Sequence, residues 1–236
     1  ATFNVDVTGV ADVPVVNFAD ARGVEDVAIP LDVSAALADL DGSETITAIT
    51  VDGVPDGAVL SAGTDNGNGT WSLDLADLTG LTITAPPDSS DDFFLNISVT
   101  ATEASGDSAT KSVEVTVDVS GIADAPNVDG VDVTGIEDTA IPLNIGIEFA
   151  DTDGSESLTV TIGGVPDGAT LNIGGVDVAP DEDGTITIAA TPAEIAEISI
   201  TPPENFSGEI PLSVVATTSE DGTDASGAIQ ALDDLY

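Results

Sequence analysis

The chain has 236 residues, and its 44 Asp and Glu residues against 2 Lys and Arg residues give a formal net charge of −42. Phosphate contacts need Lys or Arg, so this composition excludes a nucleic-acid partner and, for the same reason, insertion at an anionic membrane surface. No apolar run is long enough to span a bilayer, and the absence of Cys excludes disulfide bonds. Because the sequence begins with Ala1 and shows no signal peptide, we expect a segment of a longer protein.

The apolar residues predict a folded chain despite the charge. Hydrophobic residues make up 42% of the sequence and aromatic residues only 3%, so the expected core is thin and aliphatic. Repulsion among so many carboxylates opposes such a core unless cations neutralise them. Bound Ca²⁺ is the expected remedy, and a solvated acidic surface like that of halophilic proteins is the alternative.

The first elements along the chain are strands. Residues 1–7 carry apolar side chains at every second position, as residues 113–119 do. We therefore expect residues 1–12 to be the end strand or linker of a preceding repeat, or an extension of the first strand of the next one. Alternation with turn residues between the runs then predicts further strands. These are expected at 15–20, 27–37, 45–51, 58–61, 70–75, 81–84, 93–101 and 110–119.

The second half of the chain repeats the first. Residues 24–31 (VEDVAIPL) recur as 136–143 (IEDTAIPL), and 39–44 (DLDGSE) recur as 151–156 (DTDGSE), in both cases 112 residues later. A unit of this size matches one immunoglobulin-like sandwich of about seven strands.

We therefore predict an all-β protein of two tandem immunoglobulin-like or cadherin-like β-sandwich domains. Repeat 1 is expected over 13–124 and repeat 2 over 125–236. The sequences at 66–69 (NGNG) and 181–184 (DEDG) predict hairpin turns, and 191–197 predicts one short helical turn.

The last predicted strand of repeat 2 is uncertain. Residues 225–236 lack clean alternation. Three interpretations stay open: the segment is cut inside this domain, the domain is split by an inserted ligand-binding module, or residues 1–8 of a neighbour complete it by strand donation.

Strand direction places acids that are distant in sequence at the two ends of each domain. The upper end of a domain is defined as the end next to the linker that precedes its first strand. In domain one this end receives Asp12, Asp39, Asp41, Glu44, Glu103 and Asp107. The joint receives Glu25, Asp26, Asp88 and Asp92 from domain one, Asp124 from the linker, and Asp151, Asp153, Glu156, Glu220 and Asp224 from domain two. Glu137 and Asp138 repeat Glu25 and Asp26 in domain two.

These acids predict calcium sites. Carboxylates that converge repel one another, and only Arg22 and Lys111 are present as positive side chains. Hard oxygen ligands on flexible loops favour Ca²⁺ over transition metals, and Mg²⁺ prefers more water. For the DxDGSE loop the competing interpretation is an exposed polar turn. The Val-Pro-Asp-Gly sequence at 54–57 is best explained as a turn, and Trp71 as a core residue.

The motifs resemble known families. The order of a linker Asp-x-Pro, an Asp-x-Asp loop and an acidic loop after residue 102 resembles cadherin domains, and the fuller pattern of EDxxIPL, DxDGSE, VPDGA and ITPP is similar to the extender repeats of bacterial repeats-in-toxin (RTX) adhesins. This resemblance implies a type I secreted protein of the bacterial cell surface. It also implies that Ca²⁺ is bound by Asp12, Asp39, Asp41, Asp124, Asp151 and Asp153, together with Glu25, Asp26, Glu137, Asp138, Glu103 and Asp107. The RTX nonapeptide itself is absent.

The resemblance also implies the partners. These are neighbouring repeats of the same chain, stiffened by Ca²⁺, and a host or biofilm surface bound through other domains of the protein. We expect a monomer, with strand donation between copies as an alternative.

The composition bears on other functions as well. Catalysis is not expected, because the chain has no His or Cys and only one Trp and one Tyr to line a sugar cleft. The alternatives that stay open are a carbohydrate- or ice-binding module, a scaffold for an inserted ligand-binding domain, and an accessory domain of a secreted hydrolase.

Overall fold

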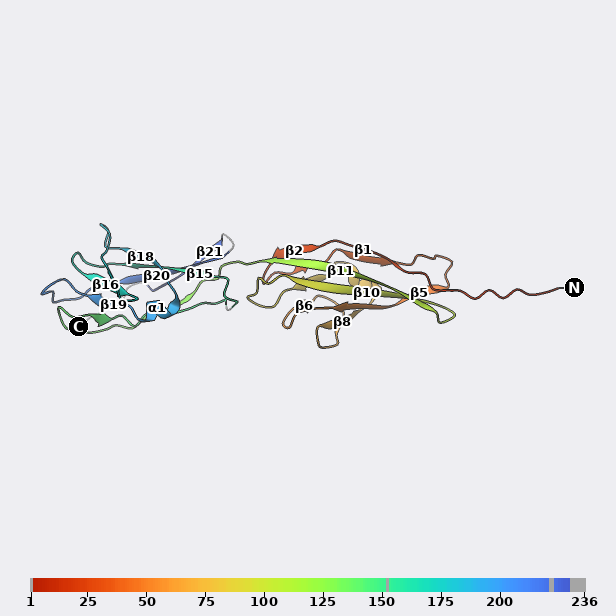
Figure 1. Cartoon of the computed structure of the whole chain (residues 1–236), viewed down its shortest axis with the longest axis horizontal. Helices are drawn as coiled ribbons and strands as arrows, with labels where there is room; N and C mark the ends of the chain where they lie inside the picture. The colour runs from red at the N-terminus through yellow and green to blue at the C-terminus, as the bar shows by residue number, and fades with distance from the viewer. Residues whose placement is uncertain (1, 152, 221–222, 230–236) are drawn as a thin grey trace. The chain divides into compact units, whose positions relative to one another are not determined.

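The computed structural model describes residues 2–151, 153–220 and 223–229, and the side chains of those up to residue 220 (Figure 1). The chain divides into two compact units, Ala1–Gly121 (unit 1) and Ile122–Tyr236 (unit 2). In the described part, none of the helices has the length and apolar character needed to cross a membrane.

Unit 1 is a β-sandwich. One sheet has the strand order β2-β11-β10-β5-β8-β7, and the three-stranded sheet β3-β9-β6 with the β1-β4 pair faces it across the core. Its elements are β1 (Val15–Phe18), β2 (Ala21–Val24), β3 (Ile29–Pro30), β4 (Val33–Ala36), β5 (Glu44–Asp52), β6 (Val59–Leu60), β7 (Thr64–Asp65), β8 (Thr70–Leu73), the 3₁₀ helix η1 (Leu75–Leu78), β9 (Thr82–Thr84), β10 (Phe93–Glu103) and β11 (Ser108–Ser120).

The alternation in the sequence explains this packing. In β10 and β11 every second side chain points into the sandwich, so Ile97 and Val117 are fully buried while their Ser and Thr neighbours lie on the outer face. Ile29 and Ile83 fill the core from the opposite sheet. The core is aliphatic, as predicted, and Trp71 packs at its margin, which confirms its interpretation as a core residue.

Two early strand predictions differ from the structure. The prediction at 15–20 is confirmed as β1, while β2, which follows it in the other sheet, was not predicted; the prediction at 27–37 becomes β3 and β4. The break between β1 and β2 lies where the chain crosses between sheets, since β1 pairs with β4 while β2 runs parallel to β11. The break between β3 and β4 follows Pro30, which has no backbone N–H to donate.

Unit 2 repeats the sandwich with sheets β18-β15-β20-β21 and β13-β19-β16-β17 and the pair β12-β14. Its elements are β12 (Asn127–Asp129), β13 (Ile141–Pro142), β14 (Gly146–Glu148), β15 (Ser157–Gly163), β16 (Thr170–Ile173), β17 (Val176–Val178), β18 (Ile186–Ala189), α1 (Pro192–Ala196), β19 (Ser199–Thr201), β20 (Ser213–Glu220) and β21 (Thr223–Ile229). The all-β, sandwich fold class predicted from the sequence is confirmed in both units.

The predicted turns have different outcomes. Residues 66–69 form the hairpin turn between β7 and β8, as predicted. Residues 181–184 form a turn closed by the Asp181 N–H, which donates to the Thr185 carbonyl, but β17 and β18 on either side belong to different sheets. The predicted helical turn at 191–197 is confirmed as α1, which starts with a capping box between Thr191 and Glu194.

The two ends of the chain differ from the simplest expectation. Residues 2–14 form no strand and do not lengthen β1, and Phe3, Val5 and Val7 are exposed. At the other end, Thr223–Ile229 form β21 and pair antiparallel with β20. The rest of the uncertain strand, 230–236, lies outside the described residues.

Candidate metal centres

The upper end of unit 1 is built around two glutamates on neighbouring strands. Glu44 begins β5 and Glu103 ends β10, and the strand register sets them directly opposite each other. Their side chains are only 4% and 7% exposed. Like charges opposite each other across a sheet are destabilising, and burial adds to the cost. The pair therefore requires a positively charged partner.

The segment before β1 closes over this pair. The Asp12 N–H donates a short hydrogen bond to Glu44 Oε1, and the Ala11 N–H donates to Asp107 Oδ2 at 2.9 Å. Ser105 Oγ donates to the Gly9 carbonyl at 3.0 Å. The structure thus gathers Asp12, Glu44 and Asp107, which are distant in sequence, as predicted.

The DLDGSE loop adds two more carboxylates at this end. The Asp41 N–H donates to Asp39 Oδ1 at 3.0 Å, and the Ser43 N–H donates to Asp41 Oδ1 at 2.8 Å. Ser43 Oγ also bonds Asp41 and donates to Glu103 Oε2 at 3.0 Å. The bonds from Ser43 lower the pKa of Asp41, so this carboxylate stays ionised. These are turn hydrogen bonds, as the competing interpretation expects, and they also tie the loop to the buried Glu103.

Unit 2 repeats the arrangement. The Asp124 N–H donates to Glu156 Oε1 at 2.9 Å, as the Asp12 N–H does to Glu44. The Asp153 N–H donates to Asp151 Oδ1 at 2.9 Å. Thr218 Oγ1 donates a short hydrogen bond to the Asp124 carbonyl. The same contacts recur because the same residues recur 112 positions later.

Burial raises the pKa of Glu156 above its ordinary value of 4.5, and the negative charges of Asp151, Glu220 and Asp124 raise it further. The hydrogen bond from the Asp124 N–H acts in the opposite direction. A carboxyl group in this environment gains from either a proton or a cation.

Among the described side chains, all five buried acids belong to the predicted set: Glu25, Glu44, Glu103, Asp151 and Glu220. Three buried carboxylate oxygens of the predicted set have no hydrogen-bond partner, namely Glu44 Oε2, Asp151 Oδ2 and Glu156 Oε2. Buried polar atoms are normally satisfied, so each of these oxygens calls for a ligand.

The opposite, lower ends of the two units, which contain Asp26 in unit 1 and Asp138 in unit 2, also match each other. Asp26 accepts from the Asp88 N–H at 3.3 Å, and Asp138 accepts from the Asn205 N–H at 2.8 Å. All four of these residues have positive φ, between 52° and 61°. Asp138 and its neighbour Glu137 are exposed. Unit 2 therefore offers a weaker set here, with a neutral Asn where unit 1 has Asp88.

Each end by itself is an incomplete cation site. Among the described residues of either unit taken alone, no three carboxylate groups converge within 4.8 Å. Asp92 is used within unit 1, where its Oδ1 accepts from the Val119 N–H at 2.8 Å. The backbone of Asp224 pairs with Ser219, but its side chain lies outside the described part.

The positive side chains do not neutralise these ends. Arg22 pairs with Asp118 at 3.0 Å on β2 and β11. Lys111 lies on β11 in register with Val99. The predicted turn at 54–57 is confirmed, since the Ala58 N–H donates to the Pro55 carbonyl at 3.1 Å.

Sequence reasoning missed the hydroxyl residues that organise these ends. Ser43 links the loop to Glu103, and Thr218 holds the Asp124 carbonyl. The only available signal was that Ser43 recurs as Ser155 within the repeated loop, where its hydroxyl again bonds an aspartate, Asp153.

No protein-family model and no curated protein matches the chain. Among solved structures, the EC22–24 segment of mouse cadherin-23 is similar over 92% of this chain and 64% of that one, at 14% identity and a TM-score of 0.46. Titin domains Z1Z2, crystallised in complex with telethonin, are similar over 93% of this chain and 95% of that one, at 10% identity and a TM-score of 0.30. BcpA, the major pilin subunit of Bacillus cereus, is similar over 92% of this chain and 66% of that one, at 11% identity and a TM-score of 0.34. These likenesses concern the fold, and the candidate metal centres depend on the geometry given above.

Proposed function

We propose that this chain is a non-catalytic, calcium-rigidified extender segment of a large secreted bacterial surface adhesin. In this proposal the acidic ends of successive units bind Ca²⁺ together. The chain then holds a ligand-binding region of the full protein away from the cell.

The observation that carries the proposal is that three buried carboxylate oxygens, Glu44 Oε2, Asp151 Oδ2 and Glu156 Oε2, have no hydrogen-bond partner in the part of the chain that the structure describes. Burying a charge without a partner is costly, and evolution normally removes such groups or pairs them. Glu44 and Glu156 occupy equivalent positions in the two units, so their oxygens are better explained as ligands than as errors of packing.

The chemistry of the donors favours calcium. The oxygens come from carboxylates on loops and strand ends, which can provide the six to eight ligands that Ca²⁺ takes. One unit alone gives a partial set, which supports ions shared between neighbouring units. Extracellular modules of this kind bind with a dissociation constant of roughly 10⁻⁴ to 10⁻³ M, which suits an external medium.

The proposed mechanism is electrostatic. Without Ca²⁺ the carboxylates at the ends repel one another, and the connection between units bends freely. With Ca²⁺ the same carboxylates become ligands, so repulsion is replaced by attraction and the connection stiffens. Type I secretion, the RTX family and a role in biofilms enter the proposal only through the sequence resemblance.

Calcium titration combined with small-angle scattering tests the proposal. We expect saturable heat on titrating CaCl₂ into the chelated chain, and a smaller radius of gyration in EDTA than in CaCl₂, because a connection that bends freely samples less extended arrangements. The double variant Glu44→Gln and Glu156→Gln is expected to lose most of the heat, whereas Glu114→Gln, an exposed glutamate on β11, keeps it. Scattering profiles that do not differ between EDTA and calcium contradict the proposal.

A second candidate function is binding of a hydrated carbohydrate or ice surface. It is favoured by a row of hydroxyl groups on the outer face of the large sheet of unit 1. Hydroxyl pairs there lie 2.7–2.8 Å apart across the strands, as between Thr100 and Thr110, Ser98 and Ser112, and Thr47 and Thr102. Because these hydroxyls already bond one another, the extender function remains our first choice. Pull-down on insoluble polysaccharides and an ice-adsorption assay would test the alternative.

A further inference from the structure

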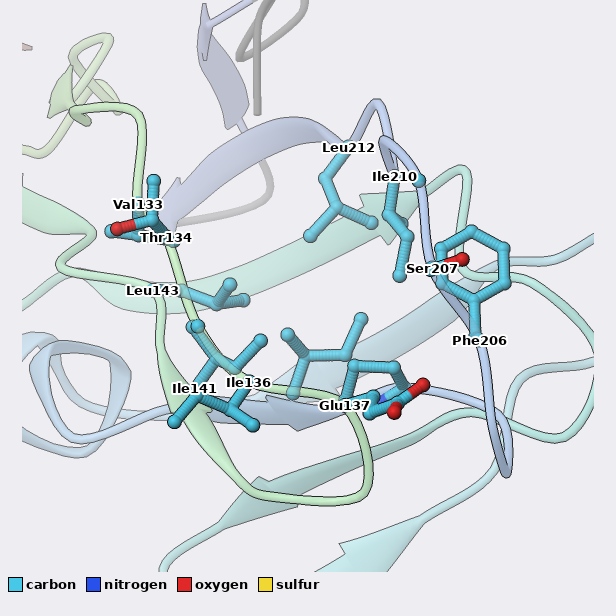
Figure 2. A pocket seen from close by; sticks show the side chains of 14 residues that line it. Val133, Thr134, Ile136, Glu137, Ile141, Leu143, Phe206, Ser207, Ile210 and Leu212 are labelled. Atoms are coloured by element: carbon cyan, nitrogen blue, oxygen red, sulfur yellow. The ribbon is translucent and has the colours of Figure 1, made fainter. Parts of the chain in front are cut away.

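Unit 2 contains an open apolar groove at a place that is closed in unit 1. Its volume is about 450 Å³, and its floor and walls include Ile141, Leu143, Phe206, Ile210 and Leu212. Figure 2 shows these side chains pointing into one space, with residues 133–137 along one edge. Its lining includes neither the DTDGSE loop nor Glu220.

In unit 1 the second half of β11 fills the corresponding place. There β11 runs parallel to β2, with Val117 beside Ala21 and Val119 beside Gly23. It also pairs with β10, where Val117 lies opposite Phe93. Val117 is fully buried as a result.

The edges of the groove keep the geometry that unit 1 uses for this strand. A Cβ on Gly23 would lie 2.5 Å from Ile29 Cγ1, and a Cβ on Gly135 would lie 2.2 Å from Ile141 Cγ1. The same close approach between a glycine backbone and an isoleucine side chain is therefore present in both units. Unit 2 retains the edge along which a strand is paired in unit 1.

Among the described residues, no strand pairs along that edge. The described part of β21 ends at Ile229, opposite Val214, whereas Leu212 and Ile210 lie further along and have no strand partner there. The residues after Ile229 are poorly suited to fill the apolar groove. It reads Gln-Ala-Leu-Asp, which offers Ala231 and Asp233 where β11 offers Val115 and Val117.

A suitable strand exists elsewhere in the chain. Residues 2–8 (TFNVDVT) align with 114–120 (EVTVDVS), so Phe3, Val5 and Val7 correspond to the buried valines of β11. These three side chains are 87%, 74% and 88% exposed. Apolar alternation of this kind is normally buried against a sheet.

We propose that the groove of unit 2 accepts residues 2–8 from a second copy of this chain as an added β-strand. The register of unit 1 then places Phe3 opposite Leu212, Val5 opposite Ile210, and Val7 beside Gly135. The contact is between two different surfaces, so it produces open chains of copies or closed rings, of which the smallest is a pair that exchanges residues 2–8 reciprocally. It needs no metal and is independent of the proposed calcium function.

Cysteine cross-linking tests the register, and the chain has no other Cys to interfere. In the proposed pairing Asn4 lies opposite Pro211 on the outer face, as Thr116 lies opposite Phe94 in unit 1. We expect Asn4→Cys and Pro211→Cys chains, mixed in EDTA and oxidised, to give a disulfide-linked heterodimer as the main product. Asn4→Cys mixed with Asn68→Cys, at a turn tip of unit 1, is the control and is expected to give only a trace. Equal yields in the two mixtures overturn the proposal.

A solution measurement keeps the test independent of the cysteines. We expect sedimentation in EDTA to show concentration-dependent association of the chain, and its loss in Val5→Asp. The Val5→Asp chain keeps its groove, so a labelled peptide of residues 2–8 is expected to bind it saturably, while the same peptide with Val5→Asp is not. A wild-type chain that stays monomeric at high concentration and does not bind the peptide overturns the proposal; residues 230–236 of the same chain would then be the occupant to examine.

Discussion

At the scale of single residues, the upper ends of the units are governed by a conflict between burial and charge. Glu44 and Glu103 face each other on adjacent strands with almost no exposure. Hydrogen bonds from Asp12 N–H and Ser43 Oγ reach one oxygen of each carboxylate. Glu44 Oε2 receives none. A divalent cation bound by both carboxylates resolves this conflict, because its positive charge replaces their repulsion with attraction.

Glu156 gives this conflict a pH dependence in the metal-free chain. Because the pKa of Glu156 is raised in the folded state, the folded chain binds more protons than the unfolded chain in the interval above 4.5. The resulting stability is present at low pH and is lost as the pH rises through the folded pKa. We expect the thermal midpoint of unit 2, measured in EDTA, to rise as the pH is lowered from neutral, because Glu156 then binds its proton in the folded state.

The matched variants isolate this effect from the titration of other acids. Glu156→Gln is expected to be more stable than the wild type at neutral pH without metal, and the difference should shrink toward acid pH. Glu148→Gln, an exposed glutamate on β14, should follow the wild type throughout. A constant difference between Glu156→Gln and the wild type over the whole range would refute the assignment.

Ser43 provides a second prediction at this scale. Its hydroxyl bonds both Asp41 and Glu103, so it holds two proposed ligands in position. We expect Ser43→Ala to weaken calcium binding by about 0.5–1.5 kcal/mol, the contribution of an ordinary hydrogen bond, as measured by calorimetry. Ser112→Ala removes an equivalent hydroxyl pair from the outer face of the sheet and serves as the control. Equal affinities for the two variants would show that Ser43 does not position the ligands.

At the scale of elements, alternation in the sequence was enough to predict most strands. The runs at 93–101 and 110–119 correspond to Phe93–Glu103 and Ser108–Ser120, because side chains of a sandwich strand alternate between core and solvent. Alternation does not say which sheet a strand joins. The crossing between β1 and β2 and the position of β17 and β18 in different sheets therefore could not be predicted.

For the candidate sites, the sequence predicted which acids gather at one end but not which of them are buried. Strand direction alone brings Asp12, Glu44 and Asp107 to one end of unit 1, and the structure joins them by hydrogen bonds. The sequence does not distinguish exposed acids from buried ones. The contrast between buried Glu44 and exposed Asp41 depends on the exact strand boundary, since Glu44 is the first residue of β5. The roles of Ser43 and Thr218 depend on side-chain direction, which periodicity does not give.

The close contact between Gly23 and Ile29 yields a prediction at this scale. A Cβ at Gly23 would overlap Ile29 inside a filled core, so Gly23→Ala is expected to destabilise unit 1 by about 1–3 kcal/mol, the usual cost of overpacking. In Gly135→Ala the clashing Ile141 borders the groove and can move into it, so the loss should be smaller. Chemical unfolding measures both.

The control for this pair is Gly146→Ala. The nearest atom to an added Cβ there lies 3.7 Å away, which is ordinary contact. It should change stability by no more than a surface substitution does. If Gly23→Ala and Gly135→Ala lower the free energy of unfolding equally, Ile141 does not move into the groove to relieve the clash. The groove would then not be an empty space in the isolated chain.

At the scale of the whole molecule, net charge alone explains little. A charge of −42 destabilises any compact state through self-repulsion, and dissolved salt relieves part of it. A halophile-like acidic surface and a set of calcium sites both predict that cations stabilise the chain. The two interpretations differ in whether the kind of cation matters.

Matched salts separate these interpretations. Monovalent salt screens exposed charges beyond about 8 Å at physiological ionic strength, but it acts weakly on buried groups such as Glu44 and Glu103. We therefore expect millimolar CaCl₂ to raise the thermal midpoint of the chelated chain far more than NaCl of equal ionic strength, with MgCl₂ in between, because Mg²⁺ gives up its water reluctantly. In Glu44→Gln with Glu156→Gln the advantage of calcium over NaCl should largely disappear, while the response to NaCl should remain. If CaCl₂, MgCl₂ and NaCl stabilise the wild type equally at equal ionic strength, the acids act only as a solvated surface and the calcium sites do not exist.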